Sequence, residues 1–307
     1  MEKENKNLMS GVIVIDKPIG MTSHDVVQIV RKGTNIRRAG HTGTLDPRAS
    51  GVLVVLVGPA VRLSEYVSAS DKRYQAIIRL GARTDTFDAD GKVTQGNSPV
   101  NVTESQFEEV LKTFIGEIEQ TPPPYSAVKV QGRKAYEMAR KGEDVELEPR
   151  KITVHHLEVL EWAPPEVVID VHCSSGTYVR SLANDLGEKL GCGAYLVGLR
   201  RTKSGRFSLR DAVPLRKLQE AFHAGNWYQY LIPAAEALAD WPAIELSPDE
   251  VEDVRHGHRV KAEEDTPLGN RVRGVSTQGE LVALMETVEG EDGKPAWQPK
   301  KVFFTSE

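Results

Sequence analysis

The distribution of apolar and polar residues along the chain predicts both strands and helices. Two continuous apolar runs, residues 11–16 and 52–57, have the length and the β-branched content of buried strands. Residues 72–80 alternate between the two kinds of side chain, which predicts a strand with one buried face. Residues 104–115 place large apolar side chains at helical spacing, so we expect an amphipathic helix there. The same patterns predict further strands at 154–160, 167–173 and 196–200, and further helices after residues 22–25, over 61–67 and over 182–190.

The composition of the chain changes near residue 240. Short β-like segments separated by glycine-rich turns follow this point, which is typical of a small all-β module. We therefore expect a larger domain over residues 1–240 and a smaller one over 241–307. The strands predicted in the smaller domain are 271–275, 281–285 and 301–304.

A proline-rich segment precedes the strand predicted at 154–160. It begins Thr121-Pro122-Pro123-Pro124-Tyr125-Ser126, and three successive prolines preclude a regular helix or a central strand. Basic residues follow, and then an acidic run. Because long structured insertions are usually functional, we interpret about residues 121–151 as a projecting arm, with a short helix around 135–140.

The overall composition is that of a soluble globular protein, since 39% of the 307 residues are hydrophobic and 27% are charged. No run of 18 apolar residues occurs, so no transmembrane helix is expected. Residues 1–7 are charged and lack an apolar core, so a signal peptide is not expected. The two cysteines, Cys173 and Cys192, lack metal-binding spacing, which argues against a zinc ribbon and a disulfide scaffold and favours a cytoplasmic location.

Charge is distributed unevenly along the chain, whose net charge is −5. Residues 236–293 contain 15 acidic and 5 basic residues, so the remainder of the chain has a net charge of +5. Basic residues are concentrated at 199–217 and at 31–38. A basic body with an acidic C-terminal part is compatible with a polyanionic substrate, but an ordinary solvated surface explains the charge equally well.

Motifs of several large enzyme classes are absent. The chain has no P-loop, no GxGxxG, no HExxH and no GxSxG, so nucleotide-binding, zinc-protease and serine-hydrolase interpretations lack support. The adjacent His155 and His156 should point to opposite faces of a strand. His256 and His258 have no third ligand nearby in the sequence. A metal site is therefore not expected at either pair.

The most distinctive stretch is the loop from Gly40 to Gly51, which contains Asp46 and precedes the apolar run 52–57. Glycine and proline permit unusual backbone angles, and loops held by rigid elements often display reactive side chains. A lone aspartate can act as nucleophile or base when a cation keeps it ionised. Arg180, at a predicted strand–helix junction, is the best candidate for that cation. The alternative is that Asp46 only caps a turn.

Two more side chains are candidates for contacts with a nucleic-acid base. Tyr74, on the strand predicted at 72–80, offers an aromatic plane for stacking. His41 lies in the same loop as Asp46 and could wedge into a nucleic acid. The alternatives are a core tyrosine and a surface histidine, which are the more usual places for these residue types.

Five stretches, taken together, resemble one known family. In chain order they are Lys17-Pro18-Ile19-Gly20-Met21-Thr22-Ser23, the loop from Gly40 to Gly51, Lys72-Arg73-Tyr74, Gly176-Thr177-Tyr178-Val179-Arg180-Ser181-Leu182 and Leu199-Arg200-Arg201-Thr202. The chain is similar to the tRNA pseudouridine-55 synthases of the bacterial TruB family. The similarity extends over residues 11–217, and the loop around Asp46 is its most specific part.

This resemblance implies an α+β pseudouridine synthase fold, with a central mixed, mostly antiparallel sheet and flanking helices. It implies that uridine 55 in the T-arm loop of tRNA is flipped out and isomerised to pseudouridine, with no cofactor and no metal. The arm resembles the RNA-gripping thumb insertion of that family, and residues 241–307 resemble its small RNA-binding β domain of PUA type.

The resemblance also assigns roles to individual residues. Asp46 matches the catalytic aspartate, which attacks C1′ or removes the 2′ proton. Arg180 matches the arginine paired with it, and Tyr74 matches the tyrosine that stacks on the flipped base. Leu199 matches the apolar contact of the pocket, and His41 matches the histidine that fills space vacated in the RNA loop.

Four further positions are expected to bind or support the substrate. Asp88 matches an acidic position that can hold Arg180 in place, and hairpin-turn capping is an equally good interpretation of this residue. Lys17 and the group from Arg200 to Arg206 are expected phosphate contacts, although non-specific surface charge is a fair alternative. Tyr178, which lies in the same motif as Arg180, is also expected to bind the substrate.

The sequence leaves two alternatives to a stand-alone enzyme. One is an RNA-binding or RNA-folding module without catalysis, against which the presence of Asp46, Tyr74 and Arg180 together argues. The other is the guide-RNA-dependent relative that needs protein partners, against which the long arm argues. We therefore expect a monomer that acts on tRNA, with no obligatory protein partner and no membrane association.

Overall fold

The structure is a computed structural model, and it describes residues 9–96, 100–126, 128–130, 132–139, 141–143, 147–290 and 293–303. The chain forms two compact units, each assembled from separate stretches of sequence. Unit 1 comprises Met1–Asp46, Leu53–Ser68 and Arg206–Glu307, and unit 2 comprises Pro47–Val52 and Ala69–Gly205.

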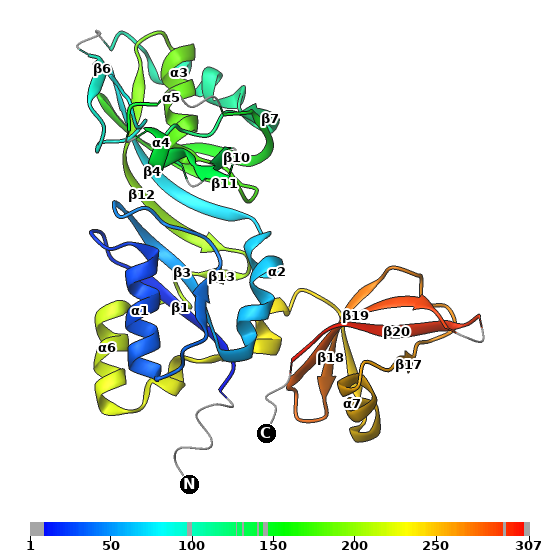
Figure 1. The fold of residues 1–307 in the computed structure, drawn as a ribbon. Helices are drawn as coiled ribbons and strands as arrows, with labels where there is room; N and C mark the ends of the chain where they lie inside the picture. Colours follow the sequence, from blue (N-terminus) through cyan, green and yellow to red (C-terminus); the bar gives the residue numbers. More distant parts are fainter. Residues whose placement is uncertain are drawn as a thin grey trace. The chain divides into compact units, whose positions relative to one another are not determined.

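The first sheet of unit 1 has the strand order β14-β1-β3, with β15 paired to β1 and β2 paired to β3. Every residue of β3 is buried, as the apolar run 52–57 predicted. Helices α1 and α6 lie side by side in this unit (Figure 1). The bounds are β1 Gly11–Lys17, β2 Ala39–His41, β3 Ala49–Val57, β14 Val213–Pro214, β15 Ile232–Pro233, α1 Ser23–Thr34 and α6 Leu215–Ala224.

Helix α1 begins where the sequence predicted a helix. The Thr22 side chain accepts a hydrogen bond from the Asp25 backbone N–H, and the Asp25 carboxylate accepts one from the Thr22 N–H in return. This capping box satisfies two donors that a helix start otherwise leaves open. Val26, Val27 and Val30 are buried, so the expected apolar face is the packed one.

The sheet of unit 2 has the order β12-β4-β11-β10-β7, and each of these strands is antiparallel to its neighbours. The start of β3 adds a parallel partner to β12, which makes the sheet mixed and mostly antiparallel. The alternation predicted for 72–80 is present in β4, where one face is buried and the other exposed. The bounds are β4 Lys72–Leu80, β7 Gly116–Gln120, β10 Arg150–Ala163, β11 Glu166–Cys173 and β12 Ala194–Ser204.

Two helices pack against this sheet. Helix α5 (Val179–Lys189) contacts β12 and β4, and α3 (Glu104–Lys112) contacts β10 and α5. Helix α3 ends three residues before the sequence predicted, although Phe114 beyond its end is still buried. Helix α5 starts earlier than the leucine spacing alone indicated, so that Arg180 lies in its first turn.

The arm contains a small hairpin followed by a short helix. The sequence predicted this helix around residues 135–140. The hairpin pairs β8 with β9, and among the described residues no other strand joins it. The bounds are β8 Lys129–Val130, β9 Arg133–Lys134 and α4 Ala135–Ala139.

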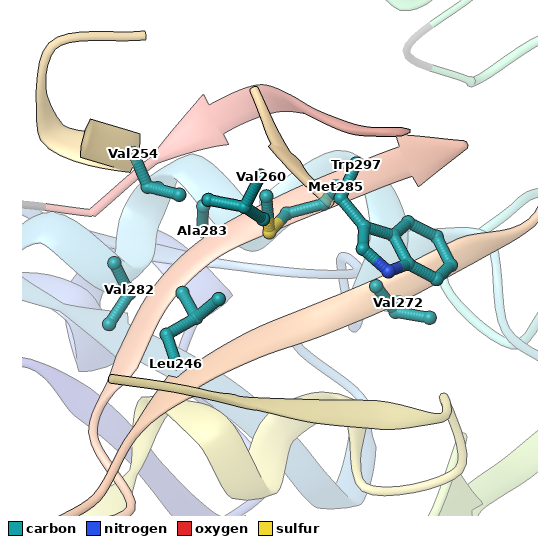
Figure 2. Close-up of a cluster of buried hydrophobic side chains, with 8 residues drawn as sticks. All are labelled: Leu246, Val254, Val260, Val272, Val282, Ala283, Met285 and Trp297. Carbon is teal, nitrogen blue, oxygen red and sulfur yellow. The ribbon is translucent and has the colours of Figure 1, made fainter. Parts of the chain in front are cut away.

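The C-terminal part of unit 1 has a sheet of its own, in the order β16-β18-β19-β20-β17. Its apolar side chains form one cluster with helix α7, in which Met285 and Trp297 are the largest members (Figure 2). The strands predicted at 271–275 and 281–285 are present, and the third lies mostly before the predicted 301–304. The bounds are β16 Ala243–Leu246, α7 Pro248–Arg255, β17 Val260–Lys261, β18 Arg271–Ser276, β19 Leu281–Glu289 and β20 Pro295–Val302.

The remaining elements are short. The segment predicted as one helix over 61–67 is a 3-10 helix followed directly by an α-helix, with a proline in the first turn of the 3-10 helix. Their bounds are η2 Gly58–Leu63, α2 Ser64–Ser68, β5 Arg83–Thr84, β6 Val93–Gln95, β13 Phe207–Ser208, η3 Trp227–Tyr230 and η4 Ala234–Leu238.

Candidate active site

The loop that contains Asp46 is fastened to the start of helix α1. The Ser23 hydroxyl accepts a hydrogen bond from the Leu45 backbone N–H at 2.8 Å and donates one to the Leu45 carbonyl at 3.0 Å. Both residues are buried. A single hydroxyl therefore fixes both polar groups of the residue that precedes Asp46, whose own side chain is half-buried.

The end of the same loop depends on a glycine. Gly51 has a φ of 100°, and a Cβ at this position would lie 2.2 Å from the Arg201 carbonyl oxygen. Gly51 and Arg201 are paired residues of β3 and β12, so the two backbones approach closely here. Only glycine fits both the backbone angle and the space, which explains why the loop ends in this residue.

Arg180 is buried and is held by a carboxylate from a distant hairpin. Its Nη1 donates to Asp88 Oδ2 at 3.1 Å, and the side chains are 11% and 15% exposed. Its Nη2 donates to the Tyr125 carbonyl at 3.4 Å, at the start of the arm. Because a guanidinium presents several donors in one plane, these contacts fix its orientation.

The second oxygen of Asp88 organises the turn of its own hairpin, which joins β5 and β6. Oδ1 accepts from Thr86 Oγ1 at 2.6 Å and from the Asp90 backbone N–H at 3.0 Å. Asp88 therefore makes both the contact with Arg180 and the turn contacts that its two interpretations predicted. Asp90 in turn forms an ion pair with Arg48, which follows Asp46 by two positions in the chain.

Tyr74 lies on the buried face of β4, between Val171 of β11 and Arg201 of β12 in the strand register, and it is 9% exposed. Leu199 lies on β12, where it pairs with Ala76 on one side and with Ala49 on the other. Leu199 is half-buried. Its pairing with Ala49 places it beside the first residue of β3.

Arg200 is half-buried, and its Nη1 donates to Ser50 Oγ at 3.4 Å. Tyr178 immediately precedes α5, and the Arg150 guanidinium carbon lies 5.5 Å from the centre of its ring. His41 is the last residue of β2, where it pairs with Val55 of β3, and it is half-buried.

The structure contradicts the phosphate role predicted for Lys17. This side chain is fully buried, and its Nζ donates to the Pro18 and Met21 carbonyls at 3.0 Å and 2.6 Å. It stabilises the turn after β1. The prediction was wrong because the sequence shows the charge of a lysine but not the backbone carbonyls that a turn directs toward it.

Arg201, which belongs to the basic group at 199–217, is also buried rather than on the surface. Its Nε donates to the Val52 carbonyl at 2.7 Å, which joins β12 to β3. The density of positive charge in this segment therefore overstates how much of it faces solvent.

The electrostatics near Tyr74 include a buried lysine and a buried thiol. Burial, to which the positive charge of Arg201 adds, lowers the pKa of Lys72 to about 8. Burial raises the pKa of the Cys173 thiol to about 11. Lys72 and Cys173 are paired residues of β4 and β11.

Sequence reasoning missed two supporting residues. These are Ser23, which the sequence places at a helix start and at the end of the first family-like stretch, and Gln120, which directly precedes the proline-rich segment. Gln120 is 1% exposed and binds the backbone of Tyr178 through both ends of its amide. The available signal was its place between an alternating strand and a proline run, which identifies a boundary but not a contact.

Two stretches of the chain match family descriptions. Residues 31–179 match the TruB family pseudouridylate synthase N-terminal domain, and residues 180–239 match the tRNA pseudouridylate synthase B C-terminal domain. The chain is 43% identical over 298 residues to a tRNA pseudouridine synthase B of Pseudomonas fluorescens, with 96% of each protein covered. The chain belongs to the TruB family of pseudouridylate synthases.

A second relative of this TruB-family chain is the tRNA pseudouridine synthase B of an Azoarcus species, 45% identical over 260 residues, with 85% of this chain and 86% of the relative covered. The prediction from the five sequence stretches is therefore confirmed, and the protein is a pseudouridine synthase.

Solved structures support the fold of this TruB-family enzyme. One, an H/ACA ribonucleoprotein bound to a substrate RNA containing 2′-deoxyuridine, matches with a TM-score of 0.74 and 28% identity, covering 97% of this chain and 86% of that one. A Cbf5-Nop10-Gar1 complex matches with a TM-score of 0.75 and 30% identity, covering 96% and 85%. The predicted α+β pseudouridine synthase fold is confirmed. Among the described helices, none has the length and apolarity to cross a membrane.

Proposed function

We propose that this enzyme converts uridine 55 in the T-arm loop of tRNA to pseudouridine, with Asp46 as the catalytic carboxylate. The observation that carries the proposal is the near-full-length similarity to enzymes named tRNA pseudouridine synthase B. The five stretches that resemble this family supply the candidate residues, and the loop around Asp46 is the most specific of them.

The reaction moves the bond between ribose and uracil without oxidation. The C1′–N1 bond breaks, the uracil rotates, and a C1′–C5 bond forms, after which the proton on C5 is lost and N1 is protonated. We propose that Asp46 begins this sequence, as a nucleophile at C1′ or as a base at the 2′ position, and that Arg180 is the cation paired with it. The buried position of Arg180 and its contact with Asp88 support this role, because a fixed guanidinium can orient a carboxylate.

The target base must leave the folded RNA loop before it can react. Extruding a nucleotide costs a few kcal/mol, which stacking and backbone contacts must offset. We propose that Tyr74 stacks on the flipped uracil, that Leu199 lines its pocket, and that His41 occupies the space left in the loop. Arg200 and Tyr178 are proposed contacts to the substrate near this pocket.

We also propose that the arm grips the RNA and that residues 241–307 form a separate small RNA-binding domain in the cytoplasm, within a monomer that needs no protein partner. The separate core of the C-terminal sheet, which includes Leu246, Met285 and Trp297, supports the proposed boundary near residue 240 (Figure 2).

The experiment compares the wild type with Asp46→Asn on a T-arm stem-loop RNA tritiated at C5 of uridine. Release of tritium reports the reaction, because C5 loses its hydrogen when the new bond forms. We expect Asp46→Asn to abolish release while the Kd from filter binding stays within about tenfold of wild type, since phosphate contacts and RNA shape supply the affinity. Asp90→Asn, which changes an exposed carboxylate of the β5–β6 hairpin, is the matched control.

Turnover by Asp46→Asn near the wild-type rate would overturn the role of Asp46. Failure of the wild type to act on the T-arm stem-loop, combined with release from another tRNA fragment, would overturn the position while leaving the reaction intact.

A further inference from the structure

The arm leaves the sheet and returns to it at one pair of residues. Gln120 ends β7 and Arg150 begins β10, and the two are paired in the antiparallel register. The two ends of the arm are therefore held next to each other by this pair, and the base of the arm is part of the sheet of unit 2.

Both ends of this base contact Tyr178, the residue that precedes helix α5. The Tyr178 backbone N–H donates to Gln120 Oε1 at 2.8 Å, and Gln120 Nε2 donates to the Tyr178 carbonyl at 3.0 Å. From the other end, the guanidinium of Arg150 lies 5.5 Å from the centre of the Tyr178 ring. Gln120 is 1% exposed, so its amide has no competition from water for these two hydrogen bonds.

The next residues of the arm continue this contact along the first turn of α5. Ser181 Oγ donates to the Thr121 carbonyl at 2.8 Å, and Arg180 Nη2 donates to the Tyr125 carbonyl at 3.4 Å. The Tyr178 side chain makes no capping hydrogen bond at the start of α5, and the contacts from Gln120, Thr121 and Tyr125 join the arm base to this end of the helix. Arg180 is thus held by the arm on one side and by Asp88 on the other.

We propose that Gln120 is a positioning residue that couples the seating of the arm to the orientation of the Arg180 guanidinium. Its amide matches one acceptor to the Tyr178 N–H and one donor to the Tyr178 carbonyl, and a glutamate of the same length offers both groups only when it is protonated. When the arm engages RNA, a shift at its base passes through Gln120 and Thr121 to the helix turn that carries Arg180. The proposal rests on the role proposed above for Arg180, and it adds a reason why arm binding and catalysis belong together.

The test uses the full chain with Gln120→Met, which keeps the length of the side chain but removes both polar atoms. We expect kcat on the T-arm stem-loop to fall roughly tenfold to hundredfold, because the Tyr178 N–H and carbonyl lose the amide that binds them, while the Kd stays within about threefold. Glu119→Met, which changes an exposed side chain next to Gln120 on the same strand, should leave kcat unchanged. A kcat for Gln120→Met within twofold of wild type would overturn the proposal.

A double-mutant cycle tests the coupling itself. The arm residues 128–147 are replaced by a short Gly-Ser linker, which retains Thr121 and Tyr125, and Gln120→Met is measured in both backgrounds. We expect the kcat loss from Gln120→Met to shrink at least threefold when the arm is replaced, since coupled residues give non-additive effects. Equal losses in both backgrounds would show that Gln120 supports only the local fold, and would overturn the coupling.

Gln120→Glu provides a second variant and a pH readout. A protonated carboxyl offers the same acceptor and donor as the amide, so kcat of this variant relative to wild type should recover as the pH falls from 8 to 5.5. A ratio that stays constant over this range would contradict the hydrogen-bonding role. Amide hydrogen exchange over residues 178–186 should accelerate in Gln120→Met and not in Glu119→Met. This last measurement needs no turnover, so it separates failure of this proposal from failure of the proposed function.

Discussion

Asp88 contacts Arg180 through one carboxylate oxygen and the turn of its own hairpin through the other. Oδ2 accepts from Arg180 Nη1 at 3.1 Å, while Oδ1 accepts from the Thr86 hydroxyl and the Asp90 N–H. The hairpin is thereby fixed in the position from which its carboxylate can hold the guanidinium. One residue thus links a local turn to a helix start 92 positions later in the chain.

Asp88→Asn separates these two contacts. An asparagine oxygen can still accept from Thr86 and from the Asp90 N–H, but its NH2 group then faces the Arg180 guanidinium, where two sets of donors repel. We expect kcat to fall about 10–100-fold, with the Kd for the T-arm stem-loop within about threefold, and the thermal midpoint of unfolding to fall as well, because the buried guanidinium loses its carboxylate. Steady-state kinetics, filter binding and a thermal melt on one preparation measure all three.

Asp90→Asn is the control for this hairpin, because it removes the exposed ion pair with Arg48 and leaves the Asp88 carboxylate in place. Equal losses of kcat in both variants would mean that the hairpin as a whole matters and that the Asp88–Arg180 contact has no special part.

Ser23→Ala should loosen the loop that carries Asp46. The Ser23 hydroxyl satisfies both backbone groups of buried Leu45, so its loss leaves a buried N–H and a buried carbonyl without this partner. We expect the free energy of unfolding to fall by about 1–3 kcal/mol, with a loss of kcat larger than the change in Kd. Urea denaturation and tritium release measure the two effects. Ser105→Ala, at an exposed position of helix α3, should change neither, and matching behaviour of the two variants would refute the role of Ser23.

The sequence predicted most elements of this fold because their patterns are local. The buried run 52–57 and the alternation over 72–80 depend only on which side chains enter a core, and β3 and β4 reproduce both patterns. The motif strings also identified Asp46, Tyr74 and Arg180 as candidates. The contacts that support them could not be predicted in the same way. Ser23 reaches Leu45 and Gln120 reaches Tyr178 across 22 and 58 positions, and no local pattern specifies such pairs.

Charge was the least reliable guide to the site. Lys17 and Arg201 carry positive charge in segments that looked like phosphate contacts, yet both are buried against backbone carbonyls. A long cationic side chain can serve the backbone as well as a ligand, and the choice depends on turn geometry and strand register. The Asp88 alternatives were undecided for a related reason, since the two oxygens of a carboxylate can serve both purposes.

Lys72→Met should change how stability depends on pH. The folded pKa of Lys72 is about 8, below the value near 10.4 of an unfolded lysine, so the unfolded chain binds more protons between these values. The contribution of Lys72 therefore makes the wild type more stable as the pH rises through this window. We expect the free energy of unfolding of Lys72→Met minus that of wild type to decrease by about 1–2 kcal/mol between pH 7 and pH 9.5.

Urea denaturation at several pH values measures this difference. Both proteins carry Cys173→Ala in this experiment, because the thiol interacts with Lys72 and its raised pKa destabilises the fold as the pH rises above 9. A difference that does not vary with pH would show that Lys72 is charged in the folded protein throughout this range.

Replacing residues 128–147 by a short Gly-Ser linker should weaken tRNA binding far more than it perturbs the fold. The base of the arm is held by the Gln120–Arg150 pair and by contacts from Thr121 and Tyr125, all of which the replacement retains. The hairpin and the short helix beyond it contact little else among the described residues, so their loss should leave the thermal midpoint of unfolding nearly unchanged.

We expect the Kd for tRNA to rise at least tenfold, and the slope of log Kd against log salt to become shallower, because basic residues of the arm are removed. Filter binding at several salt concentrations measures both quantities. An unchanged Kd would show that the arm does not grip RNA, whereas a higher Kd with an unchanged slope would show that its contribution comes from shape rather than from charge.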